Sequence, residues 1–209
     1  MYYFIDNKYD EEVIEFFVDN LIKNKWDISQ ILGEERSSKI IAEIYSQKTG
    51  QLCELKENLI VYKLDKLLDV KIPDGRFRKC DKNDMSYLPQ WACQFWVDAK
   101  LDGKTTPAKE EKRILSKLDV HYIWETNVPV SMTHAEFVSD DCVKVSWVYT
   151  PEKYRGHGFA TALIWNFCKK YRRYKNIMLN ADESYPASNK CYQKIGFKKL
   201  SINSNWTFK

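Results

Sequence analysis

The amino-acid sequence predicts a mixed α+β (α/β) fold, in which a central, mostly antiparallel twisted sheet is flanked by helices. Three strand-like runs follow one another and cover residues 121–126, 129–138 and 142–150. Because only short turns separate these runs, they favour an antiparallel meander. An apolar helical stripe within residues 154–173 then precedes a further strand at residues 176–180, and this order is typical of a parallel crossover.

The first 74 residues are expected to add a small α+β unit. Residues 10–24 carry apolar side chains at helical spacing, and a second helical stripe is followed by Gly50 as its stop. Residues 50–66 predict two short strands joined around Glu57 and Asn58. A Pro-Asp-Gly turn signal ends this part. We therefore expect a helix-helix-hairpin extension at residues 1–74 and a main domain at residues 75–209.

Local signals also predict the other elements of the main domain. A strand is expected at residues 76–80, followed by an aromatic-rich helical stretch over residues 81–100 that Asp81 or Asn83 caps. Thr105, Thr106 and Pro107 open the next helix, since proline is favoured at the first helical position. After the crossover, the pattern predicts a last helix at residues 186–195 that Gly196 ends, and then two short strands at residues 197–200 and 206–208.

The composition indicates a folded chain without a metal site or a membrane span. Of the 209 residues, 44% are hydrophobic, and the net charge of +4 is too small to attract a polyanion by itself. No apolar run approaches the roughly 20 residues of a membrane-spanning helix, and the first residues lack the order of a secretory signal. We therefore expect a cytoplasmic protein. The six cysteines form no CxxC pair and the three histidines have no metal-ligand spacing, so we expect free thiols and no metal.

A glycine-containing turn between a strand and a helix is the most informative segment. The turn covers residues 154–160, and the helix begins at once. Gly156 and Gly158 let the backbone turn tightly, and the helix start offers N–H groups and a partial positive charge to an anion such as a diphosphate. The same glycines are also compatible with a tight turn alone. The segment lacks the Gly-Lys-Ser/Thr of a Walker loop and the third small residue of a dinucleotide fingerprint.

The sequence Arg-Gly-His-Gly-Phe-Ala at residues 155–160 resembles the R/Q-x-x-G-x-G/A motif of the GNAT acetyltransferases. A second match follows downstream, where Tyr192, three further residues and Gly196-Phe197 are similar to the end of the family's last helix. The resemblance is strong over residues 142–200 and weaker back to residue 76. The sequence is especially similar to a bacterial subgroup of the family. This subgroup has an N-terminal extension and is related to glycine N-acyltransferase-like proteins. The resemblance implies the GNAT fold, in which two parallel central strands splay apart.

The resemblance also implies a cofactor, acetyl-coenzyme A (acetyl-CoA). In the family, the glycine loop and the helix start hold the pyrophosphate of this molecule. Asn189 is a further implied contact, because Tyr185 stands where many members of the family carry an asparagine. The implied cofactor-binding residues are Val148, Tyr149, Thr150, Arg155, Gly156, His157, Gly158, Phe159, Ala160 and Asn189.

By the same resemblance, an amine attacks the thioester directly. A strand N–H within residues 148–150 then stabilises the oxyanion, and Tyr192 is the general acid, a phenol whose reference pKa of about 10 keeps it protonated. Core packing is the alternative role for these residues. A covalent route through Cys142 or Cys191 lacks a histidine placed by a motif to activate the thiol. The general base stays open among four carboxylates: Glu125, Glu136, Asp182 and Glu183.

The sequence therefore predicts an N-acetyltransferase, an acyltransferase that transfers acetyl to a primary amine of a small molecule or peptide, as a monomer or homodimer. The alternative is a non-catalytic module that binds coenzyme A as a sensor or scaffold. The basic run at residues 168–175 lies roughly 22 Å along its helix from Arg155, so we expect a solvated surface and no nucleic-acid partner. Three roles stay open for residues 1–74: a degenerate half of a second fold of this kind, a lid, or a dimer contact. Three aromatic residues either line the acceptor pocket or pack the core: Trp91, Phe95 and Trp96.

Overall fold

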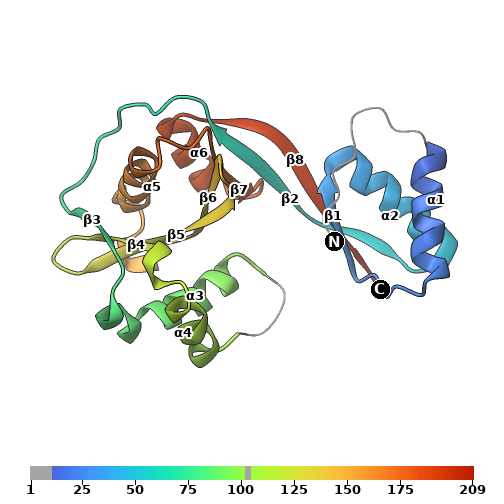
Figure 1. The fold of residues 1–209 in the computed structure, drawn as a ribbon, viewed down its shortest axis with the longest axis horizontal. Helices are drawn as coiled ribbons and strands as arrows, with labels where there is room; N and C mark the ends of the chain where they lie inside the picture. Colours follow the sequence, from blue (N-terminus) through green and yellow to red (C-terminus); the bar gives the residue numbers. More distant parts are fainter. Residues whose placement is uncertain (1–10, 102–104) are drawn as a thin grey trace. The chain divides into compact units, whose positions relative to one another are not determined.

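The computed structural model describes residues 11–101 and 105–209 (Figure 1). The helices are α1 (Glu11–Lys23), α2 (Glu35–Thr49), α3 (Leu88–Asp98), α4 (Pro107–Leu115), α5 (Phe159–Lys170) and α6 (Pro186–Ile195), with short 3-10 helices η1 (Lys82–Ser86), η2 (Leu118–Val120) and η3 (Glu152–Tyr154). The strands are β1 (Gln30–Glu34), β2 (Cys53–Leu64), β3 (Arg76–Lys79), β4 (His121–Glu125), β5 (Pro129–Ser139), β6 (Cys142–Tyr149), β7 (Asn176–Asp182) and β8 (Phe197–Phe208).

The described strands form an 8-stranded sheet in the order β1-β8-β2-β7-β6-β5-β4-β3. The pairs β3–β4, β4–β5 and β5–β6 are antiparallel, as is β1–β8, whereas β6 and β7 run parallel. The predicted meander and parallel crossover are thus confirmed, and with them the mixed α+β fold with a mostly antiparallel sheet. The parallel register joins residues 142–144 to residues 176–178, while β6 itself continues to Tyr149.

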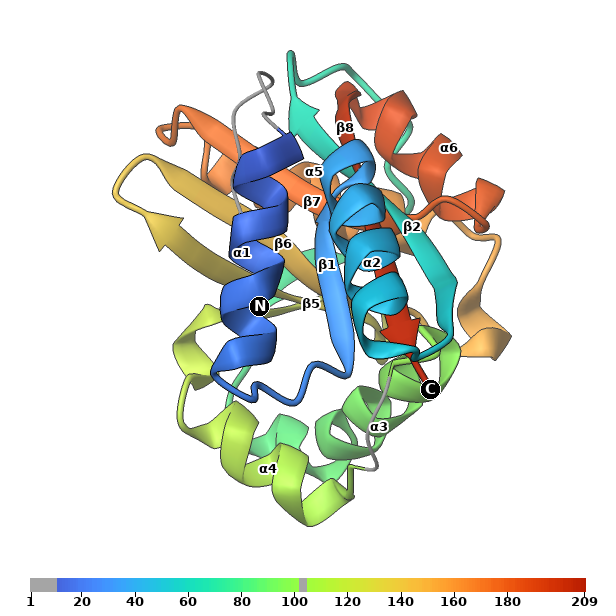
Figure 2. The ribbon, with the colours of Figure 1, turned by 90° about the vertical axis from the view of Figure 1, so that its right-hand side faces the viewer.

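By compactness the chain divides into two units. The first unit comprises the residues up to Tyr62, residues 180–186 and residues 199–209. Within it α1 and α2 pack together (Figure 2), and β1 pairs with the end of β8 from Gln30–Thr207 to Glu34–Asn203. The predicted stop of α2 is confirmed, since Gly50 adopts the left-handed conformation there. That residues 1–74 form a separate domain stays a prediction. The buried core of this unit is Ile14, Val18, Leu21, Ile28, Ile31, Ile41, Ala42 and Tyr45.

Two predicted pairs of short strands are wrong, because each pair is one continuous strand. β2 runs through Glu57 and Asn58 without a turn, and β8 runs through residues 201–205. The polar side chains that suggested a turn instead make hydrogen bonds across the sheet. Ser204 Oγ donates to Asn58 Oδ1 at 2.7 Å, and Asn205 Nδ2 donates to Glu57 Oε1 at 3.1 Å. The short strand β1 was not predicted at all.

The aromatic-rich stretch over residues 81–100 is also not one helix. It is divided into η1 and α3, and Asp81 caps η1 through a reciprocal capping box with Asp84. The break comes before Pro89, which lacks the N–H that a continuing helix would need. The next start signal is confirmed, since Thr106 caps α4 and Pro107 occupies its first position.

The second unit contains residues 63–179 and 187–198. Figure 1 shows α3 and α4 on one side of strands β3–β6 and α5 on the other. On the α5 side, the Tyr122 hydroxyl lies 2.6 Å from that of Tyr171, and its ring packs edge-on against Phe167. Strand β4 alternates, so its odd-numbered residues face α3 and α4. The buried core on that side is Cys80, Leu88, Ala92, Ile114, Ile123, Met132 and Tyr149.

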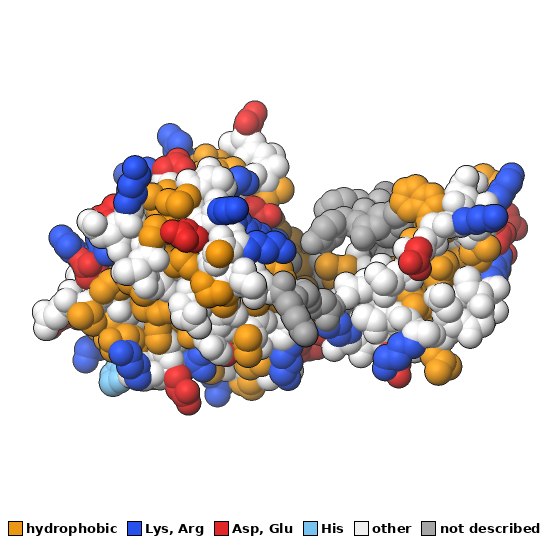
Figure 3. All heavy atoms as spheres, turned by 90° about the horizontal axis from the view of Figure 1, so that it is seen from below, with side chains coloured by type: hydrophobic (Ala, Val, Ile, Leu, Met, Phe, Trp, Pro, Cys, Tyr) orange, Lys and Arg blue, Asp and Glu red, His pale blue; other side chains and the backbone are white. Residues whose placement is uncertain are grey.

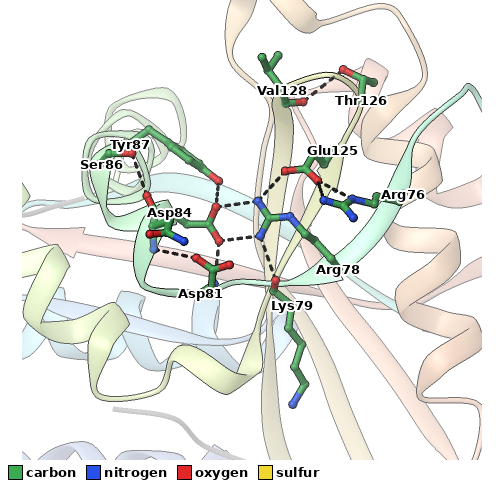
Figure 4. Close-up of polar contacts among 11 residues, drawn as sticks. Arg76, Arg78, Lys79, Asp81, Asp84, Ser86, Tyr87, Glu125, Thr126 and Val128 are labelled. Carbon is green, nitrogen blue, oxygen red and sulfur yellow. Dashed lines mark hydrogen bonds and ion pairs between the residues drawn. The ribbon is translucent and has the colours of Figure 1, made fainter.

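An ion-pair cluster joins β3, η1 and β4 in the second unit (Figure 4). Arg78 binds both oxygens of Asp84 at 2.7 and 2.8 Å, and its Nη2 also donates to Glu125 at 2.8 Å. The Tyr87 hydroxyl donates to Asp84 as well. Burial alone would raise the pKa of Asp84, but the hydrogen bonds from Arg78 and Tyr87 outweigh it and hold that pKa below its usual value. The cluster therefore stays ionised and clamps these three elements together.

Candidate active site

The glycine loop has the geometry of an anion site. Gly156 and Gly158 have φ angles of 81° and 80°, which favour glycine, and α5 begins directly after them at Phe159. No side chain caps this helix, whose first internal hydrogen bond runs from Ala162 N to Gly158 O at 3.0 Å. The loop is exposed from Arg155 to Gly158, and a Cβ atom added at Gly156 would meet no atom within 4 Å. A Cβ atom added at Gly158 would meet Pro73 Cδ at 3.9 Å, an ordinary contact. The first N–H groups of α5 therefore have no side-chain cap and suit an anion such as a diphosphate.

Arg155 connects this loop to two neighbouring elements. Its Nε donates to Thr150 O, just beyond β6, at 3.0 Å, and its Nη2 pairs with Asp98 at the end of α3. Gln94 Nε2 donates to the other oxygen of Asp98 at 2.9 Å. The guanidinium is therefore held by a carboxylate of the protein, and this contact anchors the loop. No motif in the sequence pointed to Asp98.

A β-bulge interrupts β6 next to the predicted oxyanion residues. Met132 pairs with Tyr149, but His134 pairs with Ser146, so Trp147 and Val148 lie opposite the single residue Thr133. Trp147 accordingly adopts a φ of 53°, which is unusual for a residue other than glycine. A bulge removes a residue from the regular ladder of hydrogen bonds and re-aims its neighbours.

The strand next to this bulge also loses its parallel partner. The parallel pairs end at Lys144, before the bulge begins. Beyond it, the buried Ser131 holds the end of β6, since its hydroxyl donates to Tyr149 O at 3.1 Å and lies 2.8 Å from that of Thr150. Val148 thus lies beyond the parallel pairs of β6 and within the bulge that interrupts its antiparallel pairing with β5. Tyr149 and Thr150 are held by a buried hydroxyl.

Helix α6 carries the predicted acid, Tyr192, and the predicted contact Asn189. Both residues are buried, and the Tyr192 ring packs edge-on against Phe197 at 6.3 Å. Cys191, the residue before Tyr192, contacts Thr161 of α5 with 3.1 Å between sulfur and hydroxyl oxygen. α6 is therefore packed against the first turns of the helix that begins at the glycine loop. Of the other loop residues, His157 is exposed and its ring lies 5.7 Å from that of Phe159, while Phe159 and Ala160 are half-buried.

The cysteines proposed for a covalent route are poor nucleophiles. Burial raises the pKa of the Cys191 thiol, and the hydrogen bond with Thr161 offsets this rise only in part. Burial also raises the pKa of Cys142, with Asp141 adding to the effect. Because the thiolate is the reactive form, both environments disfavour attack on a thioester.

The four candidate bases have different surroundings. Glu125 belongs to the ion-pair cluster, where hydrogen bonds from Arg78 and Arg76 lower its pKa, so it is a weak base. Glu136 accepts a hydrogen bond from Ser146 at 2.8 Å and lies 3.8 Å from Lys144. The remaining two, in the first unit, are engaged locally: Asp182 accepts from Ser184 N at 2.7 Å, and Glu183 accepts from Asn58 at 3.3 Å.

Two further classes of site are not found. Within residues 11–101 and 105–209, no group of three or more His, Cys, Asp or Glu side chains is placed to hold a metal ion. Over the same described ranges, no helix is both long and apolar enough to cross a membrane.

Comparison with known proteins assigns the class. Residues 65–197 match the family model described as Acetyltransferase (GNAT) family. The chain belongs to this family. No curated protein matches the chain. The bacterial subgroup related to glycine N-acyltransferase stays a prediction.

Solved structures share the fold at low sequence identity. An acetyltransferase from the GNAT family of Colwellia psychrerythraea aligns with a TM-score of 0.71 at 11% identity, over 100% of this chain and 78% of its own. A GCN5-related N-acetyltransferase from Kribbella flavida aligns with a TM-score of 0.63 at 12% identity, over 96% and 77% of the two chains. One from Sphaerobacter thermophilus aligns with a TM-score of 0.59 at 15% identity, over 86% and 59%.

Proposed function

We propose that the protein is an acyl-CoA-dependent N-acyltransferase that transfers acetyl from acetyl-CoA to a primary amine of a small molecule or peptide. The observation that carries the proposal is a combination of two features in the second unit. One is the start of α5, which has no side-chain cap, and the other is the bulge in β6 at residues 147–148. The family motif predicts cofactor contacts at both places.

The residues present fit acetyl-CoA. The N–H groups that follow Gly156 and Gly158 would hold its diphosphate, because oriented amides and the helix dipole attract anions. Residues 148–150 and Asn189 would contact the rest of the molecule. When bound, acetyl-CoA supplies an activated thioester.

Two groups of this chain would act on the reaction. The N–H of Val148, next to the bulge, would donate to the acyl oxygen as negative charge develops there, a role that typically changes kcat about 10²- to 10³-fold. The hydroxyl of Tyr192 would hold a proton for the departing sulfur. The raised pKa values of Cys142 and Cys191 favour direct attack by the amine over a route through an acyl-cysteine.

The basic run at residues 168–175 supports no nucleic-acid function. Two of its cations lie over the protein's own rings: Lys169 Nζ is 5.2 Å from the centre of Trp165, and Arg173 Cζ is 5.5 Å from that of Tyr174. Figure 3, drawn from the side of α3 and α4, shows a separate face on which basic side chains are interspersed with acidic and apolar ones. We therefore keep an amine substrate and no nucleic-acid partner.

Release of free thiol from acetyl-CoA in the presence of a panel of primary amines tests the proposal. We expect Tyr192→Phe to lower kcat by about 10²-fold or more, with little change in the Kd of coenzyme A, because only proton transfer is lost. Tyr174→Phe is the matched control and should keep full activity, since this tyrosine lies beyond the end of α5. Binding of coenzyme A without thiol release from any acyl chain or amine would instead favour the sensor or scaffold.

A further inference from the structure

A group of aromatic and cationic side chains surrounds the bulge on the α3–α4 side of the sheet. The Arg113 cluster, as we name it, consists of Trp96, Arg113, His121, His134 and Trp147. The Arg113 guanidinium carbon lies 4.4 Å from the centre of the Trp147 ring and 5.9 Å from that of Trp96. The His134 ring lies 5.1 Å from Trp147 and stacks on His121 at 5.2 Å. The cluster therefore joins α3, α4 and β4–β6 beside Val148.

Within residues 11–101 and 105–209, no ion pair balances the charge of Arg113. The Arg113 side chain is exposed, and among the described residues it contacts the two tryptophan rings but forms no ion pair. Contact with the two rings restrains the guanidinium and leaves its N–H fork available to a carboxylate or phosphate. An arginine held in this way, without a carboxylate partner, is prepared for an external anion.

The charged groups facing His134 are mostly basic. His121, Arg113, Lys117 and Lys144 all act on it; Glu136, 3.8 Å from Lys144, is the acidic neighbour on the strands, and Asp119 acts on His121. Burial first, and then these basic groups, lower the pKa of His134 to about 3, so the ring is neutral at physiological pH. An anion placed here would meet a surplus of positive charge.

The neutral His134 ring also has a defined donor. Its Nδ1 is buried and has no hydrogen-bond partner in the described part of the chain. An unpaired buried N–H is costly, so the proton belongs on Nε2, and Nδ1 keeps only its lone pair. The ring can therefore donate from Nε2, while His121 has its Nδ1 2.9 Å from Lys117 O.

We propose that the Arg113 cluster binds an anionic group of the acceptor, so that the preferred substrates are amines that also carry a carboxylate or a phosphate. Arg113 and the Nε2–H of His134 would hold this group. Trp147 directly precedes Val148, the proposed oxyanion donor, so one ring of the cluster belongs to the residue next to that donor. That the anion belongs to the acceptor rests on the proposed function, but anion binding itself can be measured without catalysis.

The binding test needs no acetyl-CoA. Tryptophan fluorescence and histidine NMR signals of the full chain are followed during titration with β-alanine, phosphoethanolamine and propylamine. We expect saturable changes with one or both anionic amines, a rise in the pKa of His134, and no saturation with propylamine. Whichever anionic amine saturates at lower concentration identifies carboxylate or phosphate as the group.

Two matched variants decide whether the cluster is responsible. Arg113→Met keeps the side-chain length but removes the charge, and we expect it to weaken anion binding about 10- to 100-fold. Lys112→Met removes one charge from the preceding position of α4 and should bind as the unchanged protein does. Equal weakening in both variants, or saturation that survives Arg113→Met, would overturn the inference.

Turnover adds a second readout. We expect kcat/KM for β-alanine or phosphoethanolamine to exceed that for propylamine, and Arg113→Met to lower this ratio about 10- to 100-fold. A ratio near one in the unchanged protein would contradict the anion site. If no amine is acetylated, the proposed function fails, and the titration still decides whether the anion site exists.

Discussion

Among the glycines of the described residues, Gly196 leaves the least room for a side chain. Its φ is 112°, and a Cβ atom added there would lie 1.8 Å from Lys66 O. Two hydrogen bonds hold the segment that follows β2 against this point, from Asp65 N to Gly196 O at 3.2 Å and from Leu68 N to Ile195 O at 2.9 Å. The glycine after the last helix thus does more than end it, because it lets another segment pass closely.

Replacing this glycine should be costly for stability. We expect Gly196→Ala to lower the free energy of unfolding by about 3 kcal/mol, through left-handed strain and the displaced carbonyl. Gly156→Ala, at a φ of 81° with no atom within 4 Å, should cost only about 1 kcal/mol. Urea denaturation of both variants gives the comparison. Equal losses would mean that the segment at Lys66 moves aside freely.

At the scale of elements, the Arg78 cluster determines how β3, η1 and β4 stay together (Figure 4). Asp84 has 4% of its side chain exposed, so removing its partner leaves a buried charge. The outer arginine, Arg76, is 73% exposed and binds the same Glu125. The two arginines carry the same charge, but only Arg78 pairs with a buried carboxylate, so we expect the two to differ in their contribution to stability.

Arg78→Met should destabilise the protein by about 3 kcal/mol at pH 7, whereas Arg76→Met should cost less than about 1 kcal/mol. The pKa values of Asp84 and Glu125 are lowered in the folded state. Their contribution is therefore present above the unfolded pKa of about 4 and is lost as the pH falls through the lower folded values.

The melting temperature between pH 7 and pH 3 measures this effect. The unchanged protein should lose stability steeply below about pH 4, and Arg78→Met should lose less over the same range, because its carboxylates are no longer stabilised as anions. Parallel curves for the two proteins would show that these carboxylates do not control acid unfolding.

Elements with a local chemical signal were predictable from the sequence. Gly50, Thr106 and Pro107 marked helix ends that the structure confirms, because caps depend on a few neighbouring residues. The continuity of β2 and β8 was not predictable, because it depends on contacts between distant parts of the chain. Asn58 and Ser204, which a hydrogen bond joins across the sheet, are 146 residues apart in the sequence. The bulge at Trp147 likewise arises from the register between two strands and has no signature in its own residues.

The same division holds for the candidate site. The glycine loop was predicted because its conformation depends on its own residues, and the family motif supplied only a proposed role for Tyr192. The partner of Arg155 lies 57 residues away, and the Arg113 cluster gathers side chains from several elements. Such contacts follow from tertiary packing, so the sequence pattern alone could not reveal them.

At the scale of the whole molecule, the compact units do not follow the order of the residues along the chain. The compact unit that holds the N-terminal helices also includes residues 199–209. No local sequence pattern predicts this grouping, because it depends on pairing between β1 and the last strand.

The cysteines offer a way to follow unfolding of the chain, since three are buried and three are half-buried.

Thiol labelling should therefore report unfolding. We expect Cys168, fully buried and with its pKa raised by burial, to resist iodoacetamide in the native state and to react in urea. Cys53 and Cys93, both half-buried, should react earlier. Peptide mass spectrometry after timed labelling distinguishes the sites. Rapid native labelling of Cys168 would show that the core around α5 opens readily.

The contact between Arg155 and Asp98 has a consequence for how a negatively charged ligand would be held. Because a carboxylate already neutralises this arginine, attraction at the loop would come mainly from aligned peptide dipoles at the start of α5. Dipoles in fixed positions act over short distances, where dissolved ions screen little. Affinity for the ligand would then depend on the backbone conformation more than on ionic strength. Substitutions elsewhere in the loop that keep the two glycines would leave this affinity largely unchanged.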